Sequence, residues 1–395
     1  NSIDIDHFKN YYKGKHLLKV DDTLKALGLI AKGFRLESKA EVIGITGSAG
    51  KTITKDIVSH ILRKKFRVVS TQGNFNNQIG VPLTLLKVNP FTERVVIELA
   101  SNHPGEIDYL SNLVLPDSAI ITNIYPTHLE FLKDLDGVWE EKSSIFKYSK
   151  THFINLDCPL ISQKHILFPG KKVTYSFFKK NRQADFVLLS LEEQESRYNV
   201  RLGTKDYGEA DFMIKNIAGR HNVESVLAGL VISLNSGVDI TTAIEALSDF
   251  TPPEGRMEQF IRNGIIIIND AYNSNPASFK YAIDYLVNIQ VPGKKFLVCS
   301  DMLELGETSG ELHREIGEYL KAKEINIIIL NGDHINELSK VLKNNPGEKV
   351  RGFRNLEDIL RYLENIINPG DLILFKGSHG TGLYKIPLKI KEEGL

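Results

Sequence analysis

The stretch ITGSAGKTITK, residues 45–55, decides the fold, because it joins an apolar run to an amphipathic helical pattern. The run AEVIG before it is typical of a buried strand, and the glycines after it allow a tight turn into the helix. The common phosphate-binding pattern GxxxxGK[ST] would place glycine at position 45, where this chain has Ile45. The segment is therefore a variant of that pattern at a strand-to-helix junction.

The residue types in this turn still fit a phosphate. Glycines let backbone N–H groups turn toward phosphate oxygens, and the following helix adds its positive N-terminus. A lysine neutralises charge and a threonine hydroxyl can reach Mg²⁺. The residues that we expect to bind nucleotide here are Gly47, Gly50, Lys51 and Thr52. The alternative is a glycine-rich turn without a ligand, and neither interpretation names the reaction.

Composition excludes several classes of protein. The chain has 395 residues, of which 42% are hydrophobic and 25% charged, and its formal net charge is zero. It therefore lacks the basic surplus that binds nucleic acid nonspecifically. Cys158 and Cys299 are far apart in the sequence, which argues against a disulfide framework or a zinc site. No apolar run is long enough for a membrane span, and we expect a monomeric cytoplasmic protein.

Strands and helices alternate along most of the chain. The apolar segments EVIGI, RVVS, RVVIELA, SAIITNI and HFINLD read as strands between helical patterns, which is typical of an α/β fold with a parallel sheet. The segment 184–203 reads instead as an antiparallel hairpin, and two helical patterns follow it. After TPPEGR, residues 251–256, the alternation restarts with GIIIIND, KKFLVCSDM, INIIILNG, KVRGF and DLILFKGS.

The breaks divide the chain into three parts. Residues 1–39 form a lead-in with one helical pattern, VDDTLKALGLIAKGF. Residues 40–251 form a central, P-loop ATPase-like domain with a parallel sheet, and residues 252–395 form a Rossmann-like, doubly wound C-terminal domain. We expect TPPEGR to be the linker between the last two parts.

An ordered set of segments narrows the function. After the glycine-rich turn come GNFNNQIGVPLTLL, IELASNHPGEI, TNIYPTHLEFL, EEKSSIF, GRHNVES, EGRMEQF, NDAYNSNP and KGSHGTGL. Together these segments resemble the Mur ligases, the ATP-dependent amide-forming enzymes of peptidoglycan assembly. The resemblance runs from about Val20 to the C-terminus. It is most similar to the members that add D-alanyl-D-alanine to UDP-MurNAc-tripeptide through an acyl phosphate, so ATP, Mg²⁺ and these two substrates are the implied ligands.

The resemblance assigns roles in the central domain. It implies that Lys51 and Thr52 hold the phosphates of ATP, and that Thr52, Glu98 and His128 ligate Mg²⁺, of which two ions are implied. The residues alone leave other interpretations open. Glu98 could be a solvated residue at the end of a strand, and His128 could be a structural or surface histidine, since Mg²⁺ prefers oxygen ligands.

Lys142 is the least obvious candidate. In EEKSSIF it reads as a lysine on a helix surface, paired with acidic neighbours. The resemblance implies instead that this lysine is carbamylated, which turns a cation into an anionic oxygen ligand for the second Mg²⁺. The residues implied to be catalytic are Lys51, His128, Lys142 and Arg256.

Further roles fall around the linker. The resemblance places Asn222 beside the adenine, Arg256 on the ATP phosphates and Asp270 on the nucleotide. From the residues alone, Asn222 could be a helix N-cap, Arg256 a solvated charge, and Asp270 the start of a turn. The implied substrate residues are Tyr272, Asn273, Asn275 and Lys376. The first three distinguish the chain from the diaminopimelate- or lysine-adding ligases, and the resemblance places Lys376 near the incoming amine.

The chain departs from the family pattern at three side chains. Ser225 stands where a second asparagine is common, Ser300 where glycine is usual, and His379 where arginine is usual. The first departure bears on adenine contacts. The last bears on recognition of the dipeptide carboxylate.

The front of the chain also departs from the pattern. Family members of this type begin with a domain that holds the uridine nucleotide, and its Phe-Ala-Leu-Lys-Gly and Asp-Gly-His segments do not occur here. We therefore expect the usual UDP-binding domain to be lacking, either because it was removed or because another carboxylate is recognised. Two alternatives follow: a Mur-like ligase with a different carboxylate and amine, or a nucleotide-binding homologue without turnover.

Overall fold

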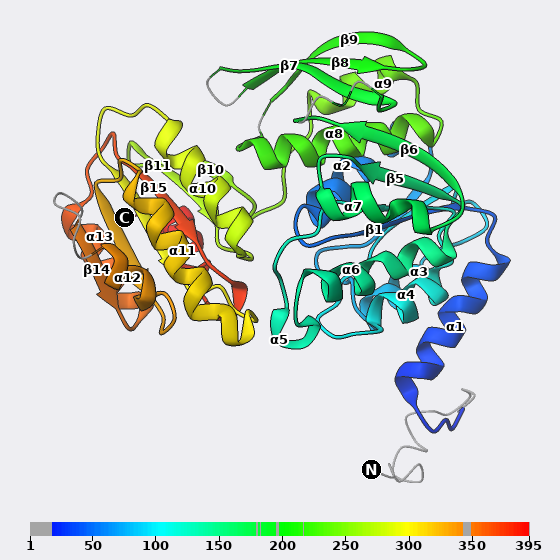
Figure 1. Cartoon of the computed structure of the whole chain (residues 1–395), viewed down its shortest axis with the longest axis horizontal. Coiled ribbons are helices and arrows are strands. Elements are labelled where there is room, and N and C mark those ends of the chain that lie inside the picture. The colour runs from blue at the N-terminus through cyan, green and yellow to red at the C-terminus, as the bar shows by residue number, and fades with distance from the viewer. Residues whose placement is uncertain are drawn as a thin grey trace.

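Two α/β units lie side by side in the computed structural model, each built on its own sheet (Figure 1). The structure describes residues 18–178, 181, 183–194, 197–215, 217–342 and 349–394. The helical pattern expected near the N-terminus is α1 (Thr23–Glu37), which packs on the larger unit. The expectation about a UDP-binding domain falls partly on residues 1–17, outside the described residues, and stays a prediction.

The larger unit has a nine-stranded sheet that is parallel over most of its width. Every neighbouring pair from β2 to β7 is parallel, while β7, β8 and β9 pair antiparallel. In sheet order the strands are β2 (Val68–Ser70), β3 (Arg94–Glu98), β1 (Glu41–Thr46), β4 (Ser118–Ile121), β5 (Thr151–Asn155), β6 (Lys171–Ser176), β7 (Phe186–Gln194), β8 (Arg197–Thr204) and β9 (Gly208–Ile214).

Apolar side chains of this sheet alternate between two cores because successive residues of a strand point to opposite faces. In β1, Ile43 and Ile45 enter one core and Val42 enters the other. The first core is covered by α2 (Lys51–Arg63), α8 (Arg220–Asn235) and α9 (Ile240–Leu247). The second is covered by α1, α3 (Gly80–Leu85), α4 (Glu106–Val114), α6 (Leu135–Ser143) and α7 (Pro159–Lys164). Helices on both faces explain the continuous apolar runs read from the sequence.

The predicted hairpin at 184–203 is confirmed as β7 and β8, but β9 extends it to a three-stranded meander. The sequence analysis missed β9 and β6. Both strands are weakly patterned, and β9 mixes charged residues with apolar ones, GEADFMI. Pairing with β8 holds β9 in place even though its own pattern is weak.

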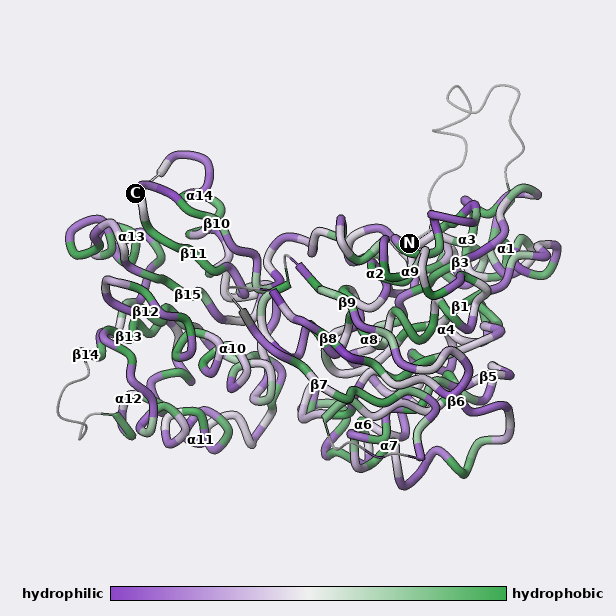
Figure 2. Tube along the Cα trace, turned by 90° about the horizontal axis from the view of Figure 1, so that it is seen from above, coloured by the Kyte–Doolittle hydropathy of each residue, from purple (hydrophilic) through white to green (hydrophobic). Residues whose placement is uncertain are grey.

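The smaller unit has a six-stranded sheet with one antiparallel edge. In sheet order its strands are β10 (Glu258–Arg262), β11 (Ile265–Asp270), β15 (Leu372–Lys376), β12 (Lys295–Ser300), β13 (Ile327–Asn331) and β14 (Lys349–Phe353). Only β10 runs antiparallel to its neighbour, and it is the strand that the sequence analysis missed here. Figure 2 shows apolar segments along these strands and polar segments in the connections.

Helices cover both faces of the smaller sheet, as expected for a doubly wound unit. One face holds α10 (Pro276–Asn288), α11 (Ser309–Lys321) and α12 (Asn336–Leu342). The other holds α13 (Leu356–Ile366) and α14 (Lys385–Glu393). The expected linker, 251–256, lies between α9 and β10 without helix or strand. The domain limits after residues 39 and 251 stay predictions. Across the described residues, none of the helices has the length and apolar character to cross a membrane.

Gly229 lets α8 approach α2 closely, and it offers a test of this packing. A Cβ there would lie 2.2 Å from Cγ2 of Ile57. We expect Gly229→Ala to lower the free energy of unfolding by about 1–3 kcal/mol, because the helices must move apart. Gly33→Ala is the matched control, since nothing lies within 4 Å of its Cβ position in α1, and it should stabilise by about 0.5–1 kcal/mol. Thermal unfolding of both variants measures the difference, and equal stability would contradict the close approach.

Candidate active site

The site begins at the carboxyl edge of the larger sheet. Strand β1 lies between β3 and β4, with Ile45 opposite Glu98 and Thr46 opposite Ile121. Because parallel strands end at the same edge, the segments after these strands meet there. The turn after β1, Glu98 at the end of β3, and the Thr122–Tyr125 segment after β4 are thus neighbours.

Two glycines of the turn are required by its geometry. Gly47 has φ 143°, and a Cβ on it would lie 2.0 Å from Oγ1 of Thr122. Gly50 has φ 78° and caps α2, and a Cβ on it would lie 2.6 Å from Oγ of Ser225. Both values of φ are in the region that disfavours other residues. A side chain at either position would force the turn away from the segments behind it.

The segment after β4 braces this turn, which the sequence analysis did not foresee. The carbonyl of Asn123 accepts from the Ser48 N–H at 3.0 Å, and its Oδ1 accepts from the Ala49 N–H at 2.9 Å. Thr122 Oγ1 donates to the Ala49 carbonyl at 2.6 Å. The available signal was their position directly after a strand that neighbours β1. Because α2 begins at Lys51 with no side-chain cap, its N-terminus is left for an anion.

Lys51 and Glu98 carry opposite charges beside the turn. Lys51 Nζ donates to the Gly47 carbonyl at 2.9 Å. Burial lowers the pKa of Lys51, and Glu98 partly opposes this shift. Glu98 is buried, so it is not the solvated strand end considered above; its Oε1 accepts from Asn76 Nδ2 at 2.8 Å. Its Oε2 is buried without a hydrogen-bond partner among the described residues, as suits a group that receives a cation.

Lys142 lies in α6 with its side chain buried, which contradicts its interpretation as a surface lysine. Burial lowers its pKa to about 7, with a further contribution from the Lys51 charge. Among the described residues, the adjacent carboxylate, Glu141, forms no ion pair with Lys142. It accepts instead from the N–H groups of Gly105 at 2.6 Å and Ile107 at 2.7 Å, at the start of α4. In the described part of the chain, the Lys142 ammonium has no hydrogen bond or ion pair. A large fraction of this amine is therefore neutral near pH 7.

His128 connects the two units. It stands at the N-cap of α5 (Leu129–Leu132) with φ 53°, and its Nδ1 is hydrogen-bonded to Oε2 of Glu304 in the smaller unit. The side chain is 15% exposed. The hydrogen bond from His128 lowers the pKa of Glu304. His128 is therefore neither a free surface histidine nor a core residue.

Arg256 also reaches across the units. Its Nη2 donates to Thr52 Oγ1 at 3.2 Å, and its guanidinium carbon lies 4.1 Å from the ring centroid of Tyr272. It is therefore not a solvated linker charge.

Asn222 is buried near the start of α8 and its Nδ2 donates to the Ala218 carbonyl at 2.8 Å. The N-cap of α8 is Gly219, so the N-cap interpretation of Asn222 is wrong.

Asp270 and Lys376 form a buried pair at the ends of β11 and β15. Lys376 Nζ lies 2.8 Å from Oδ2 of Asp270 and donates to the Asn273 carbonyl at 2.7 Å. Burial lowers the pKa of Lys376, and Asp270 opposes the shift. Asp270 Oδ1 also accepts from the Met257 N–H at 3.2 Å. Lys376 is expected to lie near substrate; in the structure its ammonium holds the loop after β11 through Asp270 and the Asn273 carbonyl.

Asn275 caps α10. Its Oδ1 accepts from the Ser278 N–H at 2.8 Å, and the Ser278 hydroxyl completes a capping box. Asn273 Oδ1 accepts from the Ser274 N–H at 2.8 Å. The asparagines of DAYNSNP therefore shape the loop before α10, and Tyr272 stacks with Arg256 at its start.

The three side chains that depart from the family pattern each make local contacts. Ser225 lies against Gly50, and its hydroxyl donates to the His221 carbonyl at 3.2 Å. The Ser300 hydroxyl is 2.7 Å from Oγ1 of Thr381, so it ties β12 to the KGSHGTGL turn. His379 is exposed and stacks on Tyr384, with centroids 4.4 Å apart.

A cavity between the units is lined by half of the expected site residues. It is lined from the larger unit by the phosphate-binding turn, and from the smaller unit by the segments around Arg256 and Asp270. Lining residues from the expected set are Gly50, Asn222, Arg256, Asp270, Asn273, Asn275 and Lys376. Tyr272 is outside the lining of this cavity, but its ring contacts Arg256, which lines it. Within the described residues, no three His, Cys, Asp or Glu side chains are grouped to hold a metal ion by themselves.

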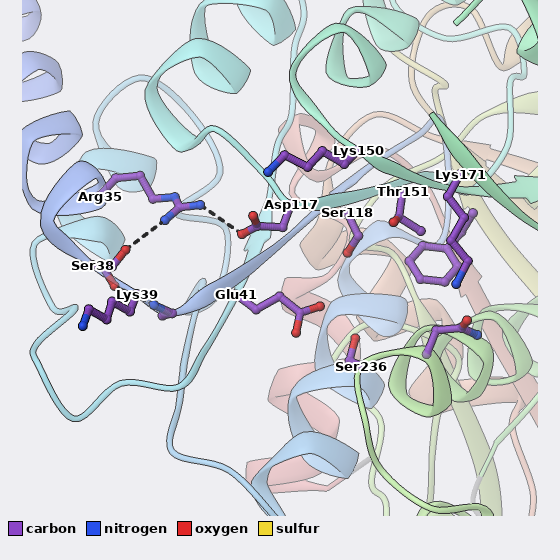
Figure 3. Close-up of a pocket in the computed structure, with 13 residues that line it drawn as sticks. Arg35, Ser38, Lys39, Glu41, Asp117, Ser118, Lys150, Thr151, Lys171 and Ser236 are labelled. Carbon is purple, nitrogen blue, oxygen red and sulfur yellow. Dashed lines mark hydrogen bonds and ion pairs between the residues drawn. The ribbon is translucent and has the colours of Figure 1, made fainter. Parts of the chain in front are cut away.

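A larger cavity, of about 420 Å³, lies elsewhere (Figure 3). It is lined by Glu41, Ser118, Thr151 and Lys171, which begin β1, β4, β5 and β6. This is the amino edge of the sheet, opposite the turn after β1. Ligands of open parallel sheets bind at the carboxyl edge, so we place the active site in the cavity between the units.

The chain belongs to the Mur ligase family. Residues 45–233 match the Mur ligase middle domain and residues 255–379 match the Mur ligase, glutamate ligase domain. It is therefore an ATP-dependent ligase that forms amide bonds.

Among its relatives, the chain is 34% identical over 386 residues to the UDP-N-acetylmuramoyl-tripeptide–D-alanyl-D-alanine ligase of Bacillus subtilis, covering 96% of this chain and 82% of that protein. It is 29% identical to the Escherichia coli ligase of the same name over 95% of this chain and 82% of that protein.

Solved structures agree with this relationship. The crystal structure I of MurF from Acinetobacter baumannii superposes with a TM-score of 0.86 at 28% identity, covering 95% of this chain and 82% of that one. MurF ligase from Thermotoga maritima in complex with ADP gives a TM-score of 0.83 at 26% identity, covering 95% and 85%. The predicted fold class and family are confirmed.

The buried amine of Lys142 predicts a pH-dependent effect on stability. Its pKa is about 7 in the fold against an ordinary 10.5, so between these values the unfolded chain binds more protons and stability rises with pH. We expect Lys142→Met to raise the melting temperature most at or below pH 7, with the gain shrinking toward pH 10.

Melting curves in CO₂-free buffer measure this dependence. The control is Lys147→Met, which removes an exposed lysine of the next turn and should change stability by no more than about 0.5 kcal/mol at any pH. A Lys142→Met gain that is absent or constant with pH would contradict the buried neutral amine.

Proposed function

We propose that this chain joins D-alanyl-D-alanine to UDP-N-acetylmuramoyl-tripeptide with hydrolysis of ATP to ADP and phosphate, in the cytoplasm. The observation that carries this proposal is that Glu98, Lys142 and Arg256 all lie close enough to Lys51 of the phosphate-binding turn to interact with its charge, and that Arg256 also contacts Thr52. The match to ligases of this name over almost the whole chain supports the same reaction.

The reaction has two displacements. A carboxylate oxygen of the tripeptide attacks the γ-phosphorus of ATP, the bond to the ADP oxygen breaks, and an acyl phosphate forms. The amine of the dipeptide then attacks the acyl carbon, the carbon–oxygen bond to phosphate breaks, and the nitrogen loses a proton. The protein contributes positioning and charge. Lys51, the first residue of α2, and Arg256, which contacts Thr52 of the same helix, stabilise negative charge on the phosphoryl oxygens.

The donors near the turn fit Mg²⁺. The free Oε2 of Glu98 is a buried anionic oxygen, and Thr52 Oγ1 lies at the start of α2. His128 completes the set in our proposal through the ring nitrogen that Glu304 does not hold. When bound, the ion neutralises phosphate charge that would repel the attacking carboxylate.

Lys142 suits carbamylation. Its neutral amine can attack CO₂, so that a nitrogen–carbon bond forms and a proton leaves, and the product is an anionic carbamate. The lowered pKa supplies the neutral amine that this step requires. A carbamate here would give the second Mg²⁺ an oxygen ligand, and it would replace the neutral amine by an anion that the Lys51 charge attracts.

The adenine of ATP has a natural place beside the start of α8. His221 stacks on Tyr281 of α10, with centroids 5.2 Å apart, and both line a cavity with Gly219 and Arg220. Asn222 follows directly on α8. An aromatic surface next to an amide matches the flat, polar-edged ring of adenine.

One observation favours a second candidate, a Mur-type ligase that takes a different amine. His379 lies between Tyr272, at 5.5 Å, and Tyr384, at 4.4 Å, where the family pattern has arginine. An arginine would offer a bidentate partner to the dipeptide carboxylate, which a histidine lacks. His379 therefore bears directly on which amine substrate the enzyme takes.

Phosphate release tests the proposal. We expect release from ATP only when UDP-N-acetylmuramoyl-tripeptide and D-alanyl-D-alanine are both present, because the acyl phosphate is consumed by the amine. Each substrate alone is the control. Formation of the pentapeptide product is followed by mass spectrometry. Release with other dipeptides but not with D-alanyl-D-alanine would favour the second candidate, and no release with any pair would contradict ligase activity in this chain.

Lys142→Ala tests the carbamate. We expect it to abolish ligation and leave ATP binding largely intact, since Lys142 lies in α6 outside the nucleotide cavity. ATP binding is measured by calorimetry, and Lys147→Ala is the control from the same segment of chain. A fully active Lys142→Ala enzyme would exclude the carbamate as a required group.

A further inference from the structure

The contact between His128 and Glu304 joins the two units, and the proposed reaction does not yet explain it. His128 belongs to the larger unit and Glu304 to the loop that follows β12 in the smaller unit. Both residues have positive φ, 53° and 63°, although neither is glycine. Residues other than glycine keep this conformation only where their surroundings enforce it. Two such residues therefore face each other across the contact.

The loop that carries Glu304 is fixed within its own unit. The Met302 N–H donates to Nε2 of His313 on α11 at 3.0 Å. The Leu303 N–H donates to Oγ of Ser378 after β15 at 3.0 Å. These bonds attach the two residues before Glu304 to α11 and to the segment after β15. The position of Glu304 thus follows the position of the whole smaller unit.

Close backbone contact accompanies the hydrogen bond. Gly306 has φ 59°, and a Cβ on it would lie 3.0 Å from Cα of Glu130 and 3.2 Å from its nitrogen. Glu130 is in α5, two residues after His128. The loop from Met302 to Gly306 therefore docks on the start of α5, at a place separate from the Arg256–Thr52 contact.

The hydrogen bond determines which nitrogen of His128 carries a proton. A carboxylate can only accept, so Nδ1 of His128 must donate to Glu304. In a neutral imidazole the other nitrogen, Nε2, then keeps its lone pair, which is the form that binds a cation. A carboxylate behind a histidine commonly orients the ring and fixes its tautomer toward a metal.

We propose that Glu304 is a positioning residue, which presents Nε2 of His128 to the cation only when the smaller unit is docked on the larger one. This inference rests on the proposed role of His128 in holding Mg²⁺. It makes the cation site dependent on domain closure, because the carboxylate that orients the His128 ring belongs to the smaller unit. ATP hydrolysis without a closed enzyme is thereby disfavoured.

The direct test is the tautomer of His128. In the full chain with ¹⁵N-labelled histidine, the ring signals of His128 are assigned by comparison with His128→Gln. We expect Glu304→Ala to move His128 from the Nδ1–H form to the Nε2–H form. Glu304→Gln should retain the Nδ1–H form, because its amide oxygen still accepts. Glu307→Ala, which removes an exposed carboxylate three residues away, is the control and should change nothing.

Cation binding is the second measurement, with Mn²⁺ as the probe and ADP present. We expect Glu304→Ala to weaken Mn²⁺ binding tenfold to a hundredfold, with Glu304→Gln close to the parent. Gly306→Ala should weaken it as well, although both side chains remain, because its Cβ separates the loop from α5.

The outcomes distinguish the positioning role of Glu304 from the metal-binding role of His128. Unchanged ring signals and Mn²⁺ affinity in Glu304→Ala, with affinity lost in His128→Gln, would overturn the inference and leave the metal role of His128 intact. Unchanged Mn²⁺ affinity in His128→Gln would overturn the metal role itself. A tautomer change with weaker Mn²⁺ binding in both Glu304→Ala and Gly306→Ala supports the coupling.

Discussion

The parallel pairing of β1 with β3 and β4 is the constraint on which the rest of the structure depends. It brings three chain segments to one edge, so the turn after β1, the carboxylate of Glu98 and the hydroxyl of Thr122 become neighbours. The turn can then approach so closely that only glycine fits at Gly47. The phosphate site is thus a consequence of strand order, and its side chains refine a geometry that the backbone has already set.

The second unit completes this edge. It contributes Arg256 to Thr52 and Glu304 to His128, at two separate places. Neither contact alone would define an orientation, but two separated contacts resist rotation of one unit on the other. The reacting groups are therefore divided between bodies that must meet before all are in place. In the reaction proposed above, such an arrangement would protect the acyl phosphate, because closure of the two units excludes water from the site.

Sequence reasoning predicted the architecture well because apolar runs and turn residues are local signals. It found twelve of the fifteen strands of the described residues from apolar runs and alternating patterns, and it missed β6, β9 and β10, which depend on pairing with neighbours. It located the phosphate-binding turn, but it could not foresee Asn123 or Glu304. Their roles arise from contacts with residues far away in the chain, and no local pattern marks them. For Asn222, local reasoning left the helix N-cap open as an alternative to its place beside the adenine, and the structure excludes that alternative because Gly219 is the N-cap.

Two buried lysines show why burial alone does not define a reactive group. Lys376 and Lys142 are both almost fully buried, and burial lowers the pKa of each. Lys376 has the carboxylate of Asp270 at 2.8 Å and a carbonyl at 2.7 Å, so its charge is compensated and it serves the loop after β11. Lys142 has the charge of Lys51 nearby instead, and its own acidic neighbour is bonded to the start of α4. The two lysines are equally buried and differ in their partners, and this difference is why we propose Lys142, and not Lys376, as the amine that is carbamylated.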